Sequence, residues 1–292
     1  MRKDVELKMI NGTTQLAGIL GWPAAHSRSP LIHNYWIRKH GVDAAYVPLP
    51  VAPADFAGAV RSLPKLGFAG ANVTVPHKQA AFLLADTRDA LSERLGVVNT
   101  LVFAKDGSIE GRNTDVYGFL ENLRVGAPGI DFAAGDAIVL GAGGAARAVV
   151  AGLLEAGSKK VRLLNRTESR AVAIAKDFAD SRIVVGNWDR RETALGGAGL
   201  LINATSLGME GAAPLELSLD ALPKTAVVHD LVYAPLETGL LRAAREKGCA
   251  SVDGLGMLLH QAVPAFNAWF GVYPDVTEDL RSMAIDDLAR IP

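Results

Sequence analysis

The sequence of 292 residues has a single cysteine, Cys249, which excludes an internal disulfide and favours a reducing compartment. Cys249 lies in a strand-like Cys-Ala-Ser-Val run, and we expect it to be a small buried hydrophobe. The chain also lacks an excess of one charge, because 30 lysines and arginines against 31 aspartates and glutamates leave a net charge of -1. This balance predicts neither a nucleic-acid partner nor attraction to an anionic membrane.

Signals for export, membrane insertion or metal binding are also scarce. Residues 1–8 lack the apolar core of a signal peptide. Residues 137–154 carry one charge, at Arg147, but the glycines at their centre favour a strand, a turn and a helix over a membrane span. The six histidines show no spacing typical of zinc ligands, so we predict no metal. We expect a cytoplasmic protein.

A glycine-rich turn is the most informative stretch that the chain does have. The apolar residues 137–140 predict a buried strand, and Gly141, Gly143 and Ala146 follow with the G-x-G-x-x-(G/A) spacing. The first glycine permits a tight turn, the second lets a pyrophosphate approach the backbone, and the small third residue lets helix and strand pack closely. Because plain strand–helix units carry similar turns, the rest of the chain must decide what this one binds.

Strand and helix signals alternate along the chain, as in a doubly wound α/β fold of about two domains. Strands are predicted at residues 14–21, 45–49, 67–75, 96–102, 137–140, 160–164, 183–185, 200–204, 226–230 and 250–252. Helices are predicted at residues 30–40, 56–63, 76–83, 116–123, 148–155, from 254 and at 277–289. In open α/β sheets, small ligands bind beyond the carboxyl ends of the strands.

Two serines follow the first predicted strand. Ser29 precedes Pro30, and the pair predicts a helix start with Ser29 as N-cap and Pro30 at the first helical position. Together with Ser27, it places two hydroxyls beside a helix N-terminus, where a carboxylate can be held. Simple capping is the alternative interpretation.

The third strand ends in Asn72-Val-Thr-Val-Pro-His-Lys78. Alternation places Val73 and Val75 on one face, and Pro76 is expected to end the strand and start a helix. Lys78 then falls in the first helical turn, where the helix dipole disfavours a cation. Such a lysine either extends into solvent or serves proton transfer near neutral pH.

Further polar residues follow in the same pattern. Asn99 and Thr100 are expected inside an apolar strand, where a buried amide needs hydrogen-bond partners. Asp115 follows Gly111-Arg-Asn-Thr and precedes a predicted helix, which it could simply cap.

Four motifs that precede the glycine-rich turn resemble those of the shikimate dehydrogenase family. They are His26-Ser-Arg-Ser-Pro30, Asn72-Val-Thr-Val-Pro-His-Lys78, Val98-Asn-Thr-Leu101 and Asn113-Thr-Asp115. The likeness extends over nearly the whole chain. It implies reduction of 3-dehydroshikimate to shikimate with NADPH, on the route to chorismate and the aromatic amino acids.

The resemblance implies a role for each matching residue. Lys78 would be the acid/base residue, paired with Asp115, and would donate a proton to the developing C3 alkoxide as hydride arrives. Ser27 and Ser29 would hold the substrate carboxylate. The residues implied to contact the rest of the substrate are Thr74, Asn99, Asp115, Tyr233 and Gln261.

The segment after strand 160–164 indicates which cofactor binds. An NAD enzyme usually carries an acidic residue there, but this chain has Asn165-Arg-Thr-Glu-Ser-Arg170. Arg166 and Arg170 can pair with a 2′-phosphate, which predicts NADP(H); a solvated, charged helix start is the alternative. With the residues implied by the resemblance, the predicted cofactor-binding set is Gly141, Ala142, Gly143, Gly144, Ala145, Asn165, Arg166, Thr167, Arg170, Leu231, Gly254 and Met257.

The resemblance also implies the domain organisation. We expect an α/β protein with an N-terminal α/β substrate domain, a doubly wound Rossmann-type NADP-binding domain and a cleft between them. The substrate domain would comprise residues 1–115, completed by C-terminal helices in 256–292, and the NADP-binding domain residues 116–255. Closure on binding is a hypothesis. The expected partner is the small-molecule substrate of a monomer or homodimer.

Two alternatives stay open. One is a quinate/shikimate dehydrogenase that also accepts quinate or NAD, because one extra hydroxyl needs only a small change of pocket. The other is a non-catalytic metabolite sensor, against which the presence of both Lys78 and Asp115 argues. His77 and Val97 depart from the family pattern, in which we expect an apolar or aromatic residue and an alanine. Neither replaces an implied ligand.

Overall fold

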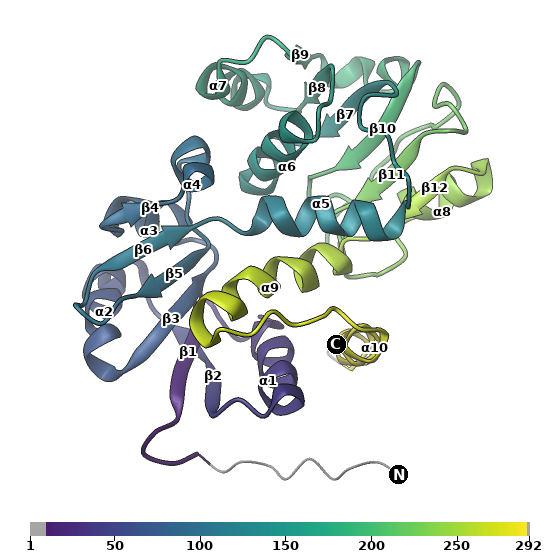
Figure 1. The fold of residues 1–292 in the computed structure, drawn as a ribbon. Coiled ribbons are helices and arrows are strands. Elements are labelled where there is room, and N and C mark those ends of the chain that lie inside the picture. Colours follow the sequence, from purple (N-terminus) through teal and green to yellow (C-terminus); the bar gives the residue numbers. More distant parts are fainter. Residues whose placement is uncertain (1–9, 291–292) are drawn as a thin grey trace, which may run out of the picture. The chain divides into compact units, whose positions relative to one another are not determined.

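A computed structural model describes residues 10–290. They form two compact units, which we call unit 1 and unit 2 (Figure 1). Unit 1 extends to Thr114 and resumes at Gln261, and unit 2 is Asp115–His260. Each unit contains a six-stranded sheet with helices, so the predicted α/β class is confirmed.

The elements of both units alternate along the chain. The strands of unit 1 are β1 (Gln15–Gly21), β2 (Ala44–Pro50), β3 (Phe68–Val73), β4 (Thr87–Arg88), β5 (Thr100–Phe103) and β6 (Ile109–Arg112), and its helices are α1 (Ser29–His40), α2 (Phe56–Ser62), α3 (Lys78–Leu84), α4 (Ala90–Leu95) and α10 (Glu278–Leu288). The strands of unit 2 are β7 (Asp136–Leu140), β8 (Val161–Leu164), β9 (Ile183–Gly186), β10 (Ala198–Asn203), β11 (Val227–Asp230) and β12 (Ala250–Val252), and its helices are α5 (Asp115–Gly126), α6 (Gly144–Glu155), α7 (Glu168–Phe178) and α8 (Gly239–Lys247). Helix α9 (Leu255–Phe270) begins in unit 2 and ends in unit 1.

The strand order of unit 1 brings several predicted site segments to one edge of its sheet. The order is β2-β1-β3-β5-β6-β4, in which β1 runs parallel to β2 and β3. Strand β5 is antiparallel to β3, and β6 is antiparallel to β5. The carboxyl ends of β1, β3 and β6 and the start of β5 therefore lie at the same edge, because Asn72 pairs with Thr100 and Thr100 pairs with Arg112.

Two tryptophans anchor the C-terminal segment of unit 1. Trp269, near the end of α9, donates its indole N–H to the Leu101 carbonyl at 2.9 Å. Its ring fills the space above Gly70, where an added Cβ would lie 2.0 Å from the Trp269 Nε1 atom. Trp36 of α1 is fully buried and donates to the Asp275 carbonyl at 3.1 Å. These buried bonds explain why residues from both ends of the chain share one core.

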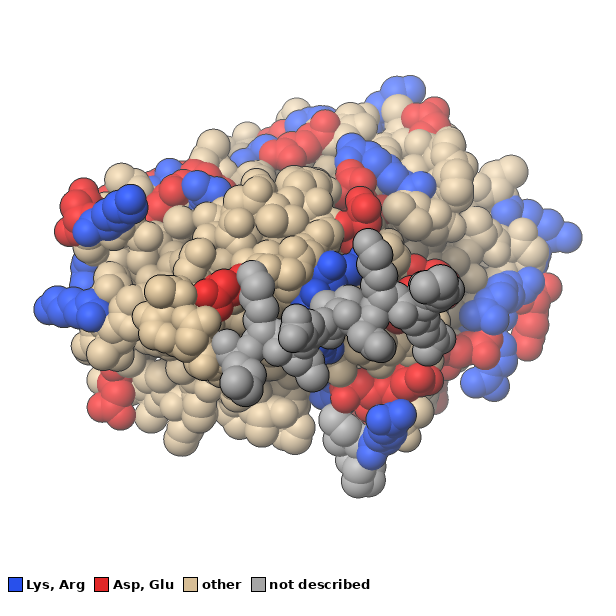
Figure 2. All heavy atoms as spheres, turned by 60° about the horizontal axis from the view of Figure 1, so that its bottom comes forward, with Lys and Arg blue, Asp and Glu red and all other residues tan. Residues whose placement is uncertain are grey.

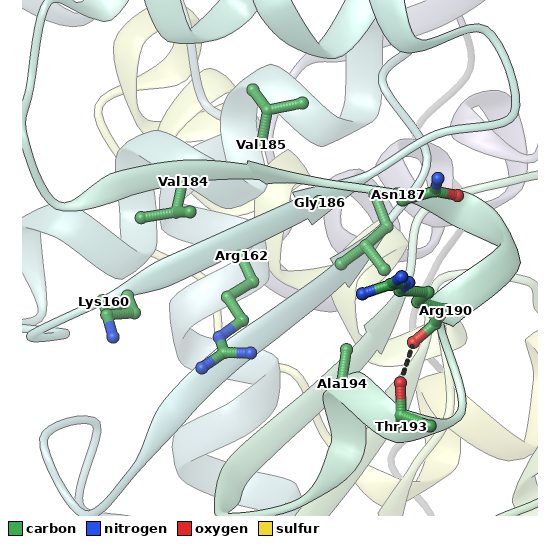
Figure 3. A pocket seen from close by; sticks show the side chains of 10 residues that line it. Lys160, Arg162, Val184, Val185, Gly186, Asn187, Arg190, Thr193 and Ala194 are labelled. Carbon is green, nitrogen blue, oxygen red and sulfur yellow. Dashed lines mark hydrogen bonds between the residues drawn. The ribbon is translucent and has the colours of Figure 1, made fainter.

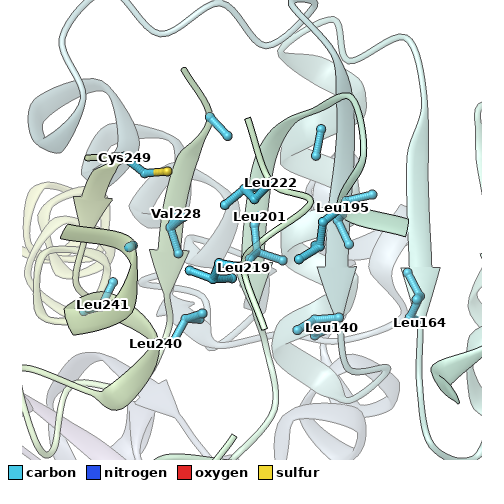
Figure 4. Packing of buried hydrophobic residues seen from close by; sticks show 14 residues of the cluster. Leu140, Leu164, Leu195, Leu201, Leu219, Leu222, Val228, Leu240, Leu241 and Cys249 are labelled. Carbon is cyan, nitrogen blue, oxygen red and sulfur yellow. The ribbon is translucent and has the colours of Figure 1, made fainter. Parts of the chain in front are cut away.

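Unit 2 has the strand order of a dinucleotide-binding fold. All its strands are parallel in the order β12-β11-β10-β7-β8-β9, so β7 lies centrally and the order reverses beside it. Leu140, Leu201 and Val228 pack with Leu240 and Leu241 of α8 on one face of the sheet (Figure 4). Burial on both faces explains why β7 reads as a continuous apolar run.

The structure corrects the predicted end of β3. The strand ends at Val73, and residues 74–77 form a turn, so Val75 is 70% exposed whereas Val73 is 2% exposed. Helix α3 begins at Lys78 instead of Pro76, because the His77 N–H closes the turn onto the Thr74 carbonyl at 2.8 Å. The sequence signals also do not predict β4, β6 or α4, which are short and rich in charged residues.

The surface carries both signs of charge. On the face in Figure 2, lysines and arginines are interspersed with aspartates and glutamates. A nucleic-acid backbone on this face would meet carboxylates as well as cations. No helix within residues 10–290 is long and apolar enough to span a membrane.

Candidate active site

Backbone hydrogen bonds join the segments at the predicted site edge of unit 1. The Thr74 N–H donates to the Leu20 carbonyl at 2.9 Å, and the Val73 N–H donates to the Asn99 carbonyl at 2.7 Å. The Val98 N–H donates to the carbonyl of Lys78 at 3.0 Å. Three segments that are distant in sequence therefore hold Thr74, Lys78 and Asn99 in one frame.

Asn99 is the centre of a buried polar chain. It is 2% exposed and lies immediately before β5 instead of inside it. Its Oδ1 atom accepts from the Thr114 N–H at 2.9 Å and from the Thr100 hydroxyl at 3.1 Å. Its Nδ2 atom donates to the Thr114 hydroxyl at 3.0 Å. The amide thus has the buried partners that the sequence requires.

The chain continues from Thr100 into the core. Asn72 Nδ2 donates to the Thr100 hydroxyl at 3.1 Å, and the Tyr46 hydroxyl donates to Asn72 Oδ1 at 2.7 Å. Burial raises the pKa of Tyr46 well above its usual value, so its hydroxyl stays protonated and able to donate. The sequence signals assign no role to Tyr46, which lies within β2, or to Thr114, which stands inside the Asn113-Thr-Asp115 motif.

His33 packs against this chain without joining it. The ring is fully buried and stacks on Tyr46, with ring centroids 4.3 Å apart. Neither ring nitrogen has a hydrogen-bond partner among residues 10–290. Burial lowers the pKa of His33 to about 3, and the nearby Asn72 amide opposes this shift only in part. The imidazole is therefore neutral at physiological pH.

The serine pair lies at the start of α1, but its local role differs from the prediction. The N-cap residue is Arg28, and Ser29 is the first helical residue. The Ser29 N–H donates to the Ser27 hydroxyl at 3.2 Å, and Ser29 itself does not cap the helix. Ser29 is 5% exposed, and Arg28 is held by Asp287 of α10 at 3.1 Å. The predicted carboxylate-binding roles of both serines stay predictions.

Lys78 and His77 are neighbours in sequence with different surroundings. His77 is 2% exposed, stacks on Phe56 with ring centroids 4.4 Å apart, and has Nε2 2.8 Å from the Val51 carbonyl. Lys78 is half-buried as the first residue of α3. The histidine is thus a core residue, which explains how this chain accommodates it where the family pattern predicts an apolar or aromatic side chain.

The glycines of the glycine-rich turn in unit 2 differ in their backbone conformation and surroundings. Gly141 has φ +109°, and an added Cβ would lie 2.8 Å from the Ala204 carbonyl oxygen. Gly143 and Gly144 have open space at the Cβ position. Helix α6 begins at Gly144, its N-cap Gly143 offers no capping side chain, and Ala146 is fully buried. The residues therefore fit a phosphate group, which free N–H groups at a helix start can bind.

The end of β8 fits the extra phosphate of NADP. Arg166, Thr167 and Arg170 are exposed around the start of α7, and the Asn165 side chain donates to the Thr167 carbonyl at 2.7 Å. Neither Arg166 nor Arg170 forms an ion pair with any residue in the described part of the chain. Glu168 lies in the first turn of α7. Two uncommitted guanidinium groups suit a dianion.

Two residues of the predicted cofactor-binding set, Leu231 and Gly254, follow β11 and β12. The Leu231 N–H donates to the Asn203 carbonyl at 3.0 Å, and the Gly254 N–H donates to the Val232 carbonyl at 3.3 Å. A Cβ at Gly254 would lie 2.2 Å from the Leu231 carbonyl oxygen, so only glycine fits. The half-buried Tyr233 and Met257 lie on the adjoining segments.

Asp230, the last residue of β11, connects the end of β10 to the start of α8 through buried hydrogen bonds. It is fully buried, accepts from Asn203 Nδ2 at 2.9 Å and from the Thr238 hydroxyl at 2.7 Å. Burial raises the pKa of Asp230, and these hydrogen bonds oppose that rise. The sequence signals miss Thr238, whose hydroxyl also caps α8. Asp230 is therefore a structural carboxylate.

A separate hollow of about 370 Å³ lies along β8 and β9 (Figure 3). Its cationic lining residues are Lys160, Arg162 and Arg190, and none of the predicted site residues lines it. Arg162 is already paired with Asp136 at 2.7 Å. Within residues 10–290, no three histidine, cysteine, aspartate or glutamate side chains gather as a metal site requires.

Comparison with known proteins gives a consistent set of relatives. Models of the shikimate dehydrogenase substrate binding domain, shikimate/quinate 5-dehydrogenase and the shikimate 5′-dehydrogenase C-terminal domain match residues 19–101, 127–209 and 254–282. A shikimate dehydrogenase (NADP(+)) from Paramagnetospirillum magneticum is 54% identical over 276 residues, which cover 94% of this chain and 100% of the relative. The chain belongs to the shikimate dehydrogenase family.

Further members of the shikimate dehydrogenase family agree in sequence and structure. A shikimate dehydrogenase (NADP(+)) from Rhodospirillum rubrum is 52% identical over 95% of this chain and 99% of the relative. The shikimate 5-dehydrogenase of Thermus thermophilus, solved with NADP(H) and shikimate, has a TM-score of 0.80 and 36% identity over 95% of this chain and 98% of that one. Quinate dehydrogenase from Corynebacterium glutamicum, solved with NAD, has a TM-score of 0.87 and 32% identity over 94% and 99%. These likenesses confirm the family resemblance and the two-part α/β fold expected from the motifs.

Proposed function

We propose that the chain catalyses the reversible, NADPH-dependent reduction of 3-dehydroshikimate to shikimate, a step in the biosynthesis of chorismate and the aromatic amino acids. The observation that carries the proposal is the hydrogen-bonded frame of unit 1, which gathers Thr74, Lys78 and Asn99 at one sheet edge. The proposal is supported by relatives that carry the name shikimate dehydrogenase (NADP(+)) and match this chain over nearly their whole length.

Lys78 carries the acid/base chemistry in this proposal. As the first residue of α3, its side chain starts from a rigid helix end, and its backbone carbonyl is fixed by the Val98 N–H. Its ammonium donates a proton to the C3 oxygen of 3-dehydroshikimate, and its neutral amine takes that proton back in the reverse direction. Asp115, the first residue of α5, is the second catalytic residue, and its pairing with Lys78 rests on the family resemblance.

The remaining substrate contacts follow the chemistry of the side chains. The hydroxyls of Ser27 and Ser29 bind the substrate carboxylate, as two donors beside a helix start can do. The substrate hydroxyls are bound by Thr74, Asn99, Asp115, Tyr233 and Gln261. Because amides and hydroxyls both donate and accept, they match a polyol better than they match an apolar substrate.

NADP(H) is the proposed cofactor, and when bound it supplies the hydride. Its pyrophosphate is held by the turn Gly141, Ala142, Gly143, Gly144 and Ala145, and its 2′-phosphate by Asn165, Arg166, Thr167 and Arg170. Leu231, Gly254 and Met257 border its nicotinamide end. The start of α6, which has no capping side chain, and the two exposed arginines support this assignment.

The proposal extends to organisation and location. We assign the substrate domain to residues 1–115 with 256–292, and the NADP-binding domain to residues 116–255. The protein acts in the cytoplasm on a small molecule, as a monomer or homodimer. The single cysteine, Cys249, supports a reducing compartment, since the chain can form no internal disulfide.

The test is NADP+ reduction with shikimate, measured for the wild type, Lys78→Ala and the control Lys65→Ala. Lys65 is an exposed lysine of unit 1 outside the proposed site. We expect Lys78→Ala to lose about 10²–10⁴-fold in kcat, the usual contribution of a general acid/base, with a much smaller change in shikimate affinity. Full activity in Lys78→Ala would rule out the proposed role, and an inactive wild type would rule out the proposed function.

A quinate/shikimate dehydrogenase is the second candidate. The likeness to the quinate dehydrogenase of Corynebacterium glutamicum favours it, whereas Arg166 and Arg170 favour NADP over NAD. Assays of shikimate and quinate, each with NADP+ and NAD+, separate the two. Comparable kcat/KM for both polyols would select the broader activity.

A further inference from the structure

Thr114 contacts both ends of the Asn99 side-chain amide. Its backbone N–H donates to Asn99 Oδ1 at 2.9 Å, and its hydroxyl accepts from Asn99 Nδ2 at 3.0 Å. Thr114 is 5% exposed and follows β6, whose last residue, Arg112, accepts from the Asn99 N–H at 3.1 Å. The backbone and the side chain of Thr114 therefore both hold the Asn99 side chain in place.

This pair of contacts fixes which way the Asn99 amide faces. A backbone N–H can only donate, so the amide atom opposite the Thr114 N–H must be the oxygen. The oxygen also accepts from Thr100, and the chain Tyr46, Asn72, Thr100 donates in one direction towards it. The Thr114 hydroxyl is a third contact of Oδ1, at 3.3 Å, so this oxygen is engaged within the protein and Nδ2 is the donor atom of the amide.

The same Thr114 hydroxyl faces a second amide. Its oxygen lies 3.5 Å from Gln261 Oε1, at the long end of hydrogen-bonding distance. Because the hydroxyl accepts from Asn99 Nδ2, its proton is shared between Gln261 Oε1 and Asn99 Oδ1, which lies 3.3 Å from the hydroxyl oxygen. The oxygen is therefore the atom of the Gln261 amide that faces Thr114.

We propose that Thr114 is a positioning residue that orients the amides of Asn99 and Gln261 together, so that both present N–H donors to the hydroxyls of the substrate. The inference rests on the proposed function, in which these two side chains bind shikimate. It adds that recognition depends on a hydroxyl that does not itself contact the substrate. Without that hydroxyl, the Asn99 nitrogen loses a buried acceptor and the Gln261 oxygen loses its donor.

The experiment compares Thr114→Val, Thr114→Ala and Thr114→Ser by KM for shikimate, KM for NADP+ and thermal stability. Loss of one or two neutral hydrogen bonds predicts that KM for shikimate rises about 5- to 30-fold in the valine and alanine variants. We expect KM for NADP+ to stay unchanged and Thr114→Ser to restore the wild-type KM for shikimate. In an Asn99→Ala background, adding Thr114→Val should raise KM for shikimate much less than it does in the wild type, because the effect of Thr114 passes through Asn99.

Thr238→Val is the matched control, because it removes another buried threonine hydroxyl, in unit 2. It should lower thermal stability without changing KM for shikimate. Three results would overturn the inference: an unchanged KM for shikimate in Thr114→Val, an equal rise in Thr114→Ser, or an equal rise in KM for NADP+. If the valine variant does not fold, the comparison of alanine with serine decides. An inactive wild type overturns the proposed function and this inference together, whereas an active wild type isolates the role of Thr114.

Discussion

Gly141 and Gly143 belong to one motif but should respond differently to the same substitution. Gly141→Ala forces an L-residue to φ +109° and places a Cβ 2.8 Å from the Ala204 carbonyl oxygen and 2.9 Å from its carbon. That backbone cannot move freely, because the Ala204 N–H donates to the Leu140 carbonyl at 2.8 Å. Gly143 has φ -93° and an open Cβ position, so Gly143→Ala meets neither problem.

The magnitudes follow from these geometries. An unfavourable positive φ costs about 1–2 kcal/mol, and overpacking against fixed atoms adds about 1–3 kcal/mol. The sum of about 2–5 kcal/mol corresponds to a fall in Tm of roughly 4–20 °C for a domain of this size. Gly143→Ala should leave Tm unchanged and raise KM for NADP+, because its methyl group occupies the space through which a pyrophosphate approaches.

Thermal unfolding and NADP+ titration of the two variants provide the measurement. Gly144→Ala, at the next open position, shows whether any methyl group at the start of α6 has the same effect on NADP+. An unchanged Tm in Gly141→Ala would refute the strain argument. An unchanged KM for NADP+ in Gly143→Ala would refute the assignment of the open space to the cofactor.

Two further predictions concern charge. Arg166→Asp should raise KM for NADP+ roughly 10- to 150-fold, which corresponds to a charge-assisted bond worth about 1.5–3 kcal/mol. The control Arg190→Asp, which replaces another exposed arginine of unit 2, should leave this KM unchanged. An equal effect of both substitutions would point to overall charge instead of a specific contact. His33, with its pKa lowered to about 3, takes up a proton in the unfolded chain near pH 6.5 but not in the folded one. Stability is therefore complete above pH 6.5 and falls as pH drops towards 3, by about 2 kcal/mol between pH 7 and 5. His33→Phe should make the fall in Tm less steep, and an unchanged slope would contradict the neutral, buried imidazole.

Much of the candidate site was predictable from local patterns. Gly141, Gly143 and Ala146 indicated a strand, a turn and a helix by spacing alone, and all three elements are present. Lys78 was expected in a first helical turn and is the first residue of α3. The predicted helix start at Pro76 was wrong, because the turn closes through the His77 N–H, a contact that no spacing rule contains.

The partners of the predicted residues were not predictable in the same way. Thr114, Thr100 and Tyr46 lie in no spacing motif that links them, and their contacts with Asn99 and Asn72 arise from the antiparallel return of β5 and β6. The conversion of His77 into a core residue depends on Phe56, which lies 21 positions earlier in a separate helix.

The sequence by itself determined the local features of this protein: the order of strands and helices, the glycine turn, the arginines that predict a 2′-phosphate and the motifs that identify the family. Those features depend on residues a few positions apart, within reach of one turn or one strand. Only the tertiary structure decided which residues hold the Asn99 amide, why Gly141 and Gly143 are glycines for different reasons, and how the polar residues from Tyr46 to Thr114 are connected. These depend on atoms that are distant in sequence and meet only when the sheets form.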